Sequence, residues 1–286
     1  MDFLRPETLA EALELKASRP DALPIAGGTD VMVELNFDHR RPSALLDLTR
    51  VPELQRWEEG LRIGAGVPYA RIIDELGARL PGLAMASRTV GSPQIRNRGT
   101  VGGNLGAASP AGDTHPVLLA SDAVIEVASV RGTRMIPAAE FYLGVKRNAL
   151  EQDELIVAVH LTPARGPQQF SKVGTRNAMV IAVCSFAISL FPRENRVGAA
   201  VGSAAPTPRR APEAERFLAS ALDFRDPKPL PDSVKREFGE LVSRAASPID
   251  DVRGSAAYRK HALAVMARRT LGWAWQELLD GERACA

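Results

Sequence analysis

Two glycine-rich segments set the strongest limits on how this chain can fold. The first, Pro24-Ile-Ala-Gly-Gly-Thr-Asp30, follows a short apolar strand and precedes a helical pattern. The second runs from Gly91 to Asp113 and combines glycines, amides and hydroxyls with one terminal carboxylate. Glycine adopts positive φ and lets a ligand approach the backbone, so each segment is a candidate anion-binding turn. The second reads as a long functional loop, because Ile95, Val101 and Leu105 give it core contacts that a disordered segment would lack.

Each segment also has a purely structural interpretation. Gly27-Gly-Thr-Asp30 can be an ordinary tight turn with a helix cap, since short glycine motifs often match by chance. Asp113 suits a ribose hydroxyl, but it can equally cap the helix expected near Pro116, with His115 at the helix start. Neither segment is a Walker loop, because no Gly-Lys-Ser/Thr follows. Gly64-Ala-Gly-Val-Pro-Tyr69 lacks the third glycine of the dinucleotide fingerprint, so a Rossmann site is not expected.

Composition excludes several classes of protein. With 36 Lys and Arg against 34 Asp and Glu, the net charge of +2 argues against a polybasic nucleic-acid binder. Two cysteines, Cys184 and Cys285, cannot build a disulfide framework, a four-cysteine zinc site or an iron–sulfur cluster. No signal peptide is visible and no window approaches the ~18 apolar residues of a membrane span, so a cytoplasmic protein is expected.

The N-terminal part predicts alternating helices and strands. Thr8 and Glu11 form a candidate capping box for the first helix. Arg131-Gly-Thr133 predicts a hairpin turn. The other expected strands and helix are Leu23–Ala26, Ala44–Leu48, Leu61–Gly66, Tyr69–Leu76 (helix), Ala123–Ala128, Arg134–Ile136 and Leu155–Leu161.

The C-terminal part predicts strands followed by helices. Pro163 to Gln169, with Gly166 and Pro167, is the candidate linker before it. Apolar residues at helical spacing place a helix over Ser255–Leu279. The remaining expected elements are strands Phe170–Val173, Ile181–Leu190 and Val197–Val201 and the helix Glu213–Leu222. The pattern indicates two α/β blocks and a β-then-α C-terminal domain.

A set of motifs in fixed order goes beyond these local patterns. It comprises Ala26-Gly-Gly-Thr-Asp30, Ile95-Arg-Asn97, Thr100-Val-Gly-Gly-Asn-Leu105, Ser109-Pro-Ala-Gly-Asp113, Lys172-Val-Gly-Thr-Arg176 with Ile181-Ala-Val183, and a C-terminal signature over 247–259. Through them the whole chain resembles the FAD-binding subunit of molybdenum hydroxylases. That family includes the medium subunit of aerobic carbon monoxide dehydrogenase and the flavin domain of xanthine dehydrogenase.

The resemblance implies an α+β protein. Its PCMH-type FAD-binding fold would have two α/β subdomains, over 1–57 and 58–165. A C-terminal domain of the carbon monoxide dehydrogenase flavoprotein type, with an antiparallel sheet and helices, would cover 170–282.

The resemblance also implies a non-covalent FAD site. Both glycine segments would hold the pyrophosphate through backbone amides, and later strands would bring two more residues to the cofactor. The residues carried over are Ile25, Ala26, Gly27, Gly28, Thr29, Asp30, Thr100, Gly103, Asn104, Ala107, Asp113, Ile156 and Lys172. Lys172 alone could instead be a solvated surface lysine, and Arg176 is expected to pair with an acidic group of the neighbouring domain. Thr29 stands where covalent relatives carry a flavin-linking side chain, and His39, His115, His160 and His261 lie outside these motifs.

The function implied is electron transfer within a complex. An iron–sulfur small subunit with [2Fe-2S] clusters and a molybdopterin large subunit would be the partners, in a heterotrimer that dimerises. FAD would pass electrons to NAD, a quinone or dioxygen. No residue of this chain need be catalytic and no metal is expected in it. The alternatives are a free-standing FAD oxidoreductase of the same fold, and a flavin-free scaffold.

Overall fold

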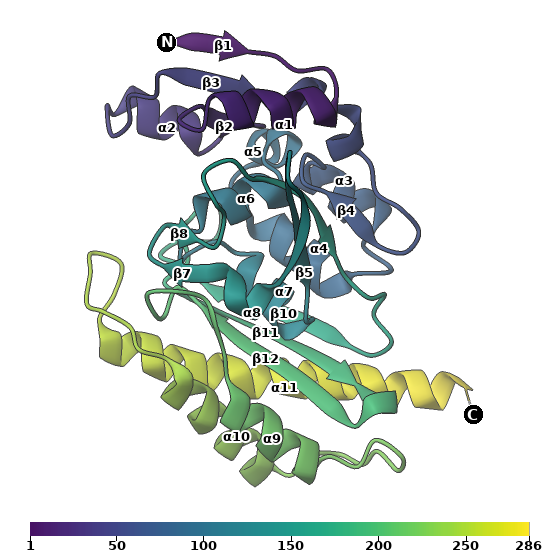
Figure 1. Cartoon of the computed structure of the whole chain (residues 1–286). Helices are drawn as coiled ribbons and strands as arrows, with labels where there is room; N and C mark the ends of the chain where they lie inside the picture. Colours follow the sequence, from purple (N-terminus) through teal and green to yellow (C-terminus); the bar gives the residue numbers. More distant parts are fainter. Residues whose placement is uncertain (286) are drawn as a thin grey trace. The chain divides into compact units, whose positions relative to one another are not determined.

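The computed structural model describes the chain from Met1 to Cys285, and its side chains as far as Gly281. The chain forms two compact units, each assembled from three separate segments. Unit 1 contains residues 1–72, 91–109 and 123–162, and unit 2 contains 73–90, 110–122 and 163–286. The three-part division by sequence position remains a prediction. Figure 1 colours the chain along its length.

Unit 1 contains a small parallel sheet at its N-terminal end. β1 and β2 both pair in parallel with β3, in the order β1-β3-β2. Helix α1 packs on this sheet, and Ala12, Leu46 and Leu54 lie in the buried core beneath it. The elements are β1 (Asp2–Leu4), α1 (Leu9–Ser18), β2 (Leu23–Ile25), α2 (Val31–Asn36), β3 (Ala44–Asp47), η1 (Leu48–Arg50) and η2 (Pro52–Gln55).

The rest of unit 1 surrounds an antiparallel sheet of order β4-β9-β5-β6 and a short hairpin, β7–β8. The turn predicted at Arg131-Gly-Thr133 is confirmed, because β5 and β6 pair as an antiparallel hairpin across it. The elements are β4 (Arg62–Gly64), α3 (Tyr69–Glu75, whose last three residues belong to unit 2), α5 (Pro93–Arg98), α6 (Val101–Ala107), β5 (Val124–Ser129), β6 (Gly132–Pro137), α8 (Ala138–Phe141), β7 (Tyr142–Gly144), β8 (Arg147–Asn148) and β9 (Leu155–His160).

The prediction of a continuous loop between Gly91 and Asp113 is wrong. Ser92 and Thr100 each accept a hydrogen bond from an amide three residues later, so each caps a short helix, α5 and α6. Ala108, in the left-handed region at φ 45°, ends α6. Glycine content concealed these helices, because glycine lowers helix propensity while local caps still nucleate a turn.

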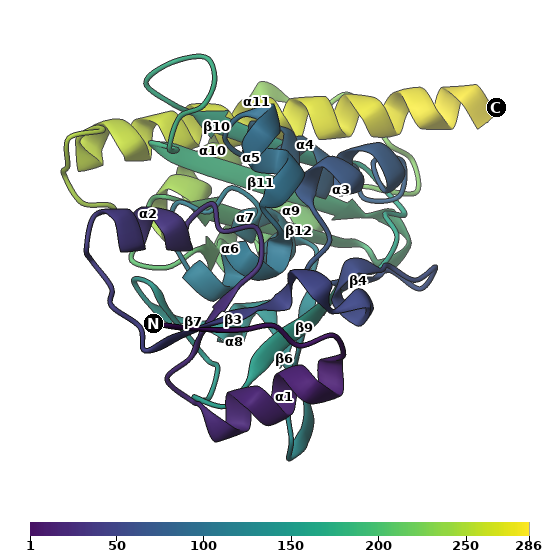
Figure 2. The same cartoon turned by 90° about the horizontal axis from the view of Figure 1, so that it is seen from above.

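Unit 2 is built on the antiparallel sheet β10-β11-β12-β13. Central strand β11 is buried from Cys184 to Leu190, since α7 packs on it as well as α11. Figure 2 shows α11 as one continuous helix. The elements are α4 (Pro81–Thr89), α7 (His115–Ala120), β10 (Gln168–Val173), β11 (Cys184–Phe191), η3 (Pro192–Glu194), β12 (Arg196–Gly202), β13 (Arg209–Arg210), α9 (Pro212–Ala221), α10 (Asp232–Ala245) and α11 (Ala256–Cys285).

The core of unit 2 is formed between the sheet and helices α9, α10 and α11. Phe186 of β11 meets Phe238 of α10 edge to face, with ring centroids 6.0 Å apart. α10 was not predicted, although Val234, Phe238 and Val242 recur at helical spacing. The sequence expectation of an α+β architecture ending in an antiparallel sheet with helices is confirmed.

Candidate functional site

The two glycine segments meet inside unit 1. A methyl group added at Gly27 would lie 1.8 Å from the carbonyl oxygen of Arg98, the last residue of α5. A methyl group on the next residue, Gly99, would lie 3.3 Å from the hydroxyl oxygen of Thr29. Only glycine fits at position 27, because any side chain would collide with backbone there. The turn after β2 and the junction of α5 and α6 therefore form one site.

The amides from Gly27 to Asp30 have no acceptor among the described residues. Their carbonyls are used, because Gly28 accepts from the Met32 amide and Asp30 from the Glu34 amide at the start of α2. Gly28 has φ of +72°, which turns the backbone here. Successive unpaired amides in a turn form a concave surface for an anion.

The second segment is organised differently from what the sequence suggested. The Gly103 amide donates to the Thr100 hydroxyl at 2.9 Å, and the Asn104 amide to the Thr100 carbonyl at 3.0 Å. These amides are therefore occupied by the cap of α6. The backbone surface itself is open, since a methyl group at Gly103 would have only the Thr100 hydroxyl within 4 Å, at 3.2 Å. Ala107 lies at the end of the same helix.

Ile156 lies against this helix. Its Cδ1 would be 3.9 Å from a methyl group placed at Gly106 of α6. The side chain comes from the buried strand β9 and is 8% exposed. Unit 1 thus brings together the sequence-predicted residues from 25 to 30 with the neighbourhood of Thr100, and it places Ile156 beside α6.

Asp113 and Lys172 form a buried ion pair within unit 2. The Lys172 Nζ lies 2.6 Å from Asp113 Oδ2, and the two side chains are only 8% and 7% exposed. The alternative of a solvated surface lysine is therefore wrong. Asp113 does not cap α7 either, because Thr114 stands at the cap position and makes no side-chain cap bond. His115 begins α7 as expected.

Thr89 forms hydrogen bonds with both residues of this pair, and the sequence analysis did not predict this contact. Its hydroxyl donates to Asp113 Oδ2 at 2.9 Å, and its carbonyl oxygen accepts from Lys172 Nζ at 3.2 Å. The three residues come from α4, the segment before α7, and β10. No local sequence signal joins them, since only the fold of unit 2 brings these segments together.

The second carboxylate oxygen of Asp113 has different surroundings. Oδ1 is buried and has no hydrogen-bond partner among the described residues. Burial raises the pKa of Asp113, and this effect outweighs the opposing influence of the Lys172 ammonium and of the Lys172 and Thr89 hydrogen bonds. A buried acceptor without a partner is costly. A ligand hydroxyl donating to Oδ1 would remove that cost.

Arg176 does not form the ion pair with an acidic group that was expected of it. Its guanidinium donates to the carbonyl oxygen of Met179, through Nε at 3.0 Å and also through Nη2. Among the described residues no acidic side chain pairs with it. Arg176 therefore closes the turn after β10 locally.

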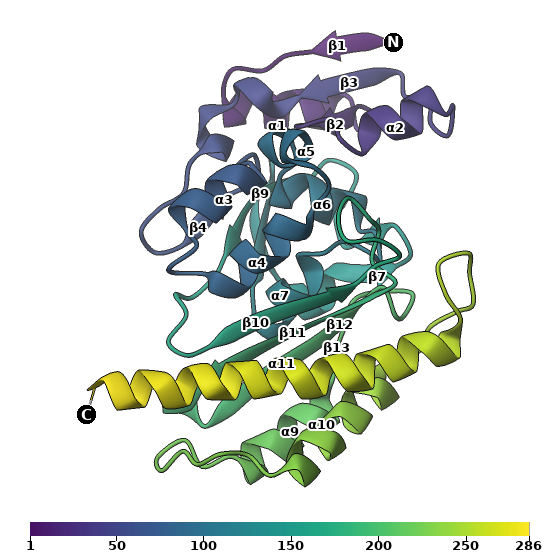
Figure 3. The ribbon, with the colours of Figure 1, turned by 180° about the vertical axis from the view of Figure 1, so that it is seen from behind.

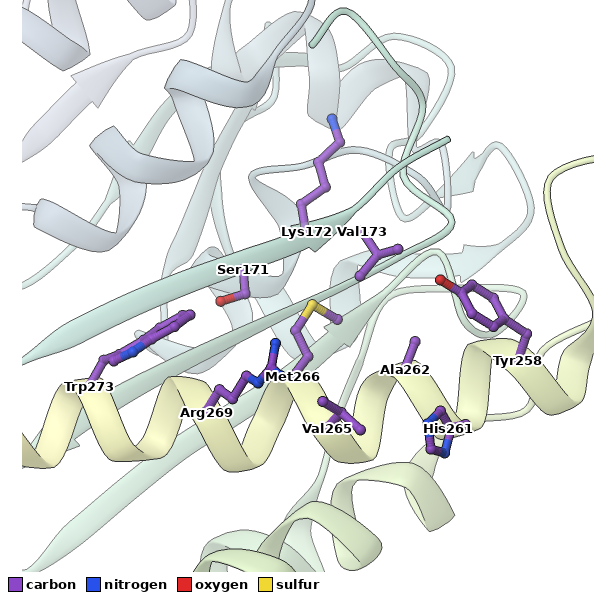
Figure 4. Close-up of a pocket in the computed structure, with 10 residues that line it drawn as sticks. All are labelled: Ser171, Lys172, Val173, Tyr258, His261, Ala262, Val265, Met266, Arg269 and Trp273. Atoms are coloured by element: carbon purple, nitrogen blue, oxygen red, sulfur yellow. The ribbon is translucent and has the colours of Figure 1, made fainter. Parts of the chain in front are cut away.

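A separate groove of about 560 Å³ lies in unit 2 between β10 and α11. Figure 4 shows Met266 and Trp273 of α11 on the side of the strand, while the Lys172 side chain points away from the helix. This direction agrees with the bond from Lys172 Nζ to Asp113. The groove is lined by side chains of β10 and α11, whereas the unpaired amides belong to the first glycine segment, in unit 1.

Two features that would bear on function are absent from the described residues. No group of three or more His, Cys, Asp or Glu side chains is placed to hold a metal ion. None of the helices in this part of the chain has both the length and the hydropathy needed to cross a membrane.

Comparison with known proteins adds family relationships to this geometry. Residues 1–164 match the model of the FAD binding domain in molybdopterin dehydrogenase, and residues 169–274 match that of the CO dehydrogenase flavoprotein C-terminal domain. The chain is 33% identical over 277 residues to the nicotine 6-hydroxylase medium subunit of Paenarthrobacter nicotinovorans, covering 94% of this chain and 95% of the relative. It is 32% identical over 282 residues to the xanthine dehydrogenase FAD-binding subunit of Escherichia coli O157:H7, covering 94% of each.

Comparison with solved structures agrees with these sequence relationships. A chain of carbon monoxide dehydrogenase from Hydrogenophaga pseudoflava superposes with a TM-score of 0.88 at 28% identity. The match covers 97% of this chain and 98% of the other.

Proposed function

Because the chain belongs to the family of FAD-binding subunits of molybdenum hydroxylases, we propose that it takes electrons from an iron–sulfur subunit and passes them through FAD to an external acceptor. The observation that supports this most directly is the run of unpaired amides from Gly27 to Asp30. An FAD pyrophosphate is a dianion that such a run can bind without any lysine or arginine.

The residues of unit 1 fit a flavin nucleotide. In the proposal, Ile25, Ala26 and Gly27 to Asp30 line the pyrophosphate, and the Thr29 hydroxyl adds a donor. Thr100 keeps α6 capped, so that the open backbone face at Gly103 can lie against the cofactor. Asn104, Ala107 and Ile156 would complete the apolar and amide contacts of this face.

In the proposal, the buried pair of Asp113 and Lys172 in unit 2 binds a hydroxyl group of the cofactor. Lys172 and Thr89 satisfy Asp113 Oδ2, which leaves Oδ1 as an oriented acceptor for a hydroxyl of the cofactor. Lys172 would act through Asp113, because its ammonium group orients the carboxylate while the ion pair as a whole carries no net charge.

The cofactor, once bound, supplies the change from one-electron to two-electron transfer. The protein binds and orients the cofactor and sets its electrostatic surroundings. No acid or base of this chain needs to act on the organic substrate, which we assign to a molybdopterin-containing partner subunit. An iron–sulfur small subunit would be the electron donor, and NAD, a quinone or dioxygen the acceptor. FAD is expected to be non-covalent, because Thr29 cannot form a flavin linkage of the His or Cys type.

An absorption spectrum of the purified protein is the primary test. The expected result is a flavin spectrum, present on isolation or restored by added FAD, with all FAD released on acid precipitation. Absence of any flavin absorption after reconstitution would leave the flavin-free scaffold as the better interpretation. A flavin that oxidises an organic substrate without partner subunits would favour the free-standing oxidoreductase.

A further inference from the structure

The C-terminal signature over 247–259 ends in a buried arginine. Arg259 lies near the start of α11 and is 4% exposed. Its guanidinium donates to the Ser203 carbonyl oxygen through Nη1 at 2.7 Å and pairs with Asp251 through Nη2. Its Nε is buried without an acceptor among the described residues. A buried donor without an acceptor costs stability, so anchoring α11 is not a sufficient reason for an arginine here.

Ser203, which accepts this hydrogen bond, has a strained backbone conformation. It follows β12 directly, is 8% exposed and has φ of +56°, in the left-handed region. Its amide donates to the Pro110 carbonyl oxygen at 2.8 Å, and its hydroxyl donates to the Ala182 carbonyl oxygen at 2.6 Å. Such a conformation persists only where the surroundings determine it. The bond from Arg259 contributes to this from α11, which Figures 1 and 3 both show running alongside the sheet of unit 2.

The hydrogen bond from the Ser203 amide anchors the segment that carries Asp113. Pro110 is the residue at which this segment enters unit 2. Between the two, Gly112 is packed so tightly that an added methyl group would lie 2.5 Å from the His115 ring at the start of α7. The segment is therefore fixed at Pro110 on one side and at α7 on the other, and a shift of Pro110 would move Asp113.

The position of Asp113 Oδ1 depends on two sets of contacts. Lys172 and Thr89 hold the other carboxylate oxygen, Oδ2. The backbone of Asp113 is placed separately, by the segment that begins at Pro110. A hydrogen bond to a ligand requires its acceptor within a few tenths of an ångström of the right place, so both sets of contacts must hold.

We infer that Arg259 is a positioning residue for the cofactor site: through Ser203 it holds the segment from Pro110 to Asp113 and so fixes the place of Asp113 Oδ1. The inference rests on the proposed function, in which Oδ1 accepts a hydrogen bond from a hydroxyl of FAD. Arg259 need not touch the cofactor, because its effect passes through the Ser203 backbone. The C-terminal signature thereby gains a part in cofactor binding, although it lies more than a hundred residues beyond Asp113 in the sequence.

The test measures the dissociation constant of FAD for the full chain by flavin fluorescence. Arg259→Lys keeps the positive charge but loses the fork that spans two acceptors, so the dissociation constant should rise about 10-fold, as for one hydrogen bond to a charged acceptor. The matched control is Arg210→Lys, the same change at an arginine that bridges Asp122 and Glu215. Neither acid lies in the segment from Pro110 to Asp113, so the control should stay within about 2-fold of the unmodified protein.

A background without the acceptor separates positioning from a general structural effect. In Asp113→Ala/Lys172→Met no Oδ1 remains, and no buried ammonium is left unpaired. Because Arg259 acts through Asp113, adding Arg259→Lys to this background should change the FAD dissociation constant by less than about 2-fold. If Arg259→Lys does not fold, Asp251→Asn gives the same comparison. It loosens the guanidinium from its other side, with a smaller expected rise of about 3-fold.

The outcomes separate positioning from its alternatives. Unchanged FAD affinity in both Arg259→Lys and Asp251→Asn would overturn the inference while leaving the proposed function intact. An equal loss of affinity in Arg210→Lys, or in the background that lacks the Asp113 carboxylate, would overturn it in favour of a general effect on the fold. If the unmodified chain binds no FAD at all, the proposed function itself fails.

Discussion

Gly27 and Arg98 meet so closely that no side chain fits between them: a methyl group on Gly27 would lie 1.8 Å from the Arg98 carbonyl oxygen. This contact fixes the turn after β2 against the end of α5. It therefore links the shape of the unpaired-amide turn to the position of the second glycine segment.

Gly27→Ala should disrupt this contact. We expect the free energy of unfolding to fall by about 2–4 kcal/mol, because the added methyl group must displace backbone, and FAD retention to fall with it. Urea unfolding and flavin content are the measurements. Gly60→Ala is the matched control, since nothing lies within 4 Å of its added methyl group. Equal behaviour of the two variants would contradict the packing argument.

Gly103→Val tests the open face of α6 separately from stability. Its added Cβ would meet only the Thr100 hydroxyl, at 3.2 Å, and valine has a slightly higher helix propensity than glycine, so the variant should fold with little loss of stability. It should nevertheless lose FAD, because the branched side chain occupies the face assigned to the cofactor. Gly272→Val in α11 is the control for propensity alone. A folded Gly103→Val protein with full flavin occupancy would refute the assignment of this face.

The Asp113–Lys172 pair predicts strong energetic coupling. Lys172→Met should destabilise the protein by about 3 kcal/mol or more, because a buried carboxylate then lacks its partner. The double variant Asp113→Asn/Lys172→Met should be less destabilised than the sum of the two single variants. A double-mutant cycle from urea unfolding measures this coupling. Additive effects would show that the two side chains do not interact across the 2.6 Å observed.

Glu126 predicts a dependence of stability on acid pH. The Arg62 guanidinium, which contacts both of its carboxylate oxygens, lowers the pKa of Glu126, and the bond to His160 adds to the effect. Because the folded pKa lies below the unfolded one, this stabilisation is present above the unfolded pKa and is lost as pH falls through the folded pKa. Glu126→Gln should therefore lower stability by about 2 kcal/mol near neutrality and flatten its decline in acid.

The control for this prediction is Glu58→Gln. Glu58 also contacts Arg62, at 3.4 Å, but its side chain is 64% exposed, so its removal should change stability little. A Glu126→Gln variant whose acid unfolding profile matches the unmodified protein would remove the basis for this assignment.

Cys184 should be chemically inert in the folded protein. Burial raises the pKa of its thiol to about 12, so almost no thiolate is present at neutral pH. In a Cys285→Ser variant, modification by a thiol reagent should occur only as fast as the protein unfolds, and denaturant should make it immediate. Rapid labelling under native conditions would mean that β11 opens locally.

Local signals predicted much of the fold. The hairpin at Arg131-Gly-Thr133 and the cap at Thr8 depend on neighbouring residues, and both are present. The predicted helix at 255–279 is also present, as part of α11. The strand predicted from Ile181 instead begins at Cys184, and Ile181 is 53% exposed. The apolar pattern begins three residues before Cys184, but β10 and β12 provide pairing partners only from Cys184 and Ser185 onward.

The candidate site was predictable only in part. The turn at Gly27–Gly28 carries its signal in its own residues, and the structure shows its amides without acceptors. The surrounding glycines concealed that Thr100 caps a helix and that its hydroxyl accepts a hydrogen bond from the Gly103 amide. The contact of Thr89 with Asp113 and Lys172 joins residues remote in sequence, and only the assembled sheet and helices bring them together.

The interleaving of the two units has a consequence for how the gene can be divided. Three segments of each unit alternate along the chain, so the polypeptide passes from one unit to the other five times. No single cut yields two fragments that each contain one whole unit. Expressing either unit by itself would therefore require three separate segments of the chain to be joined.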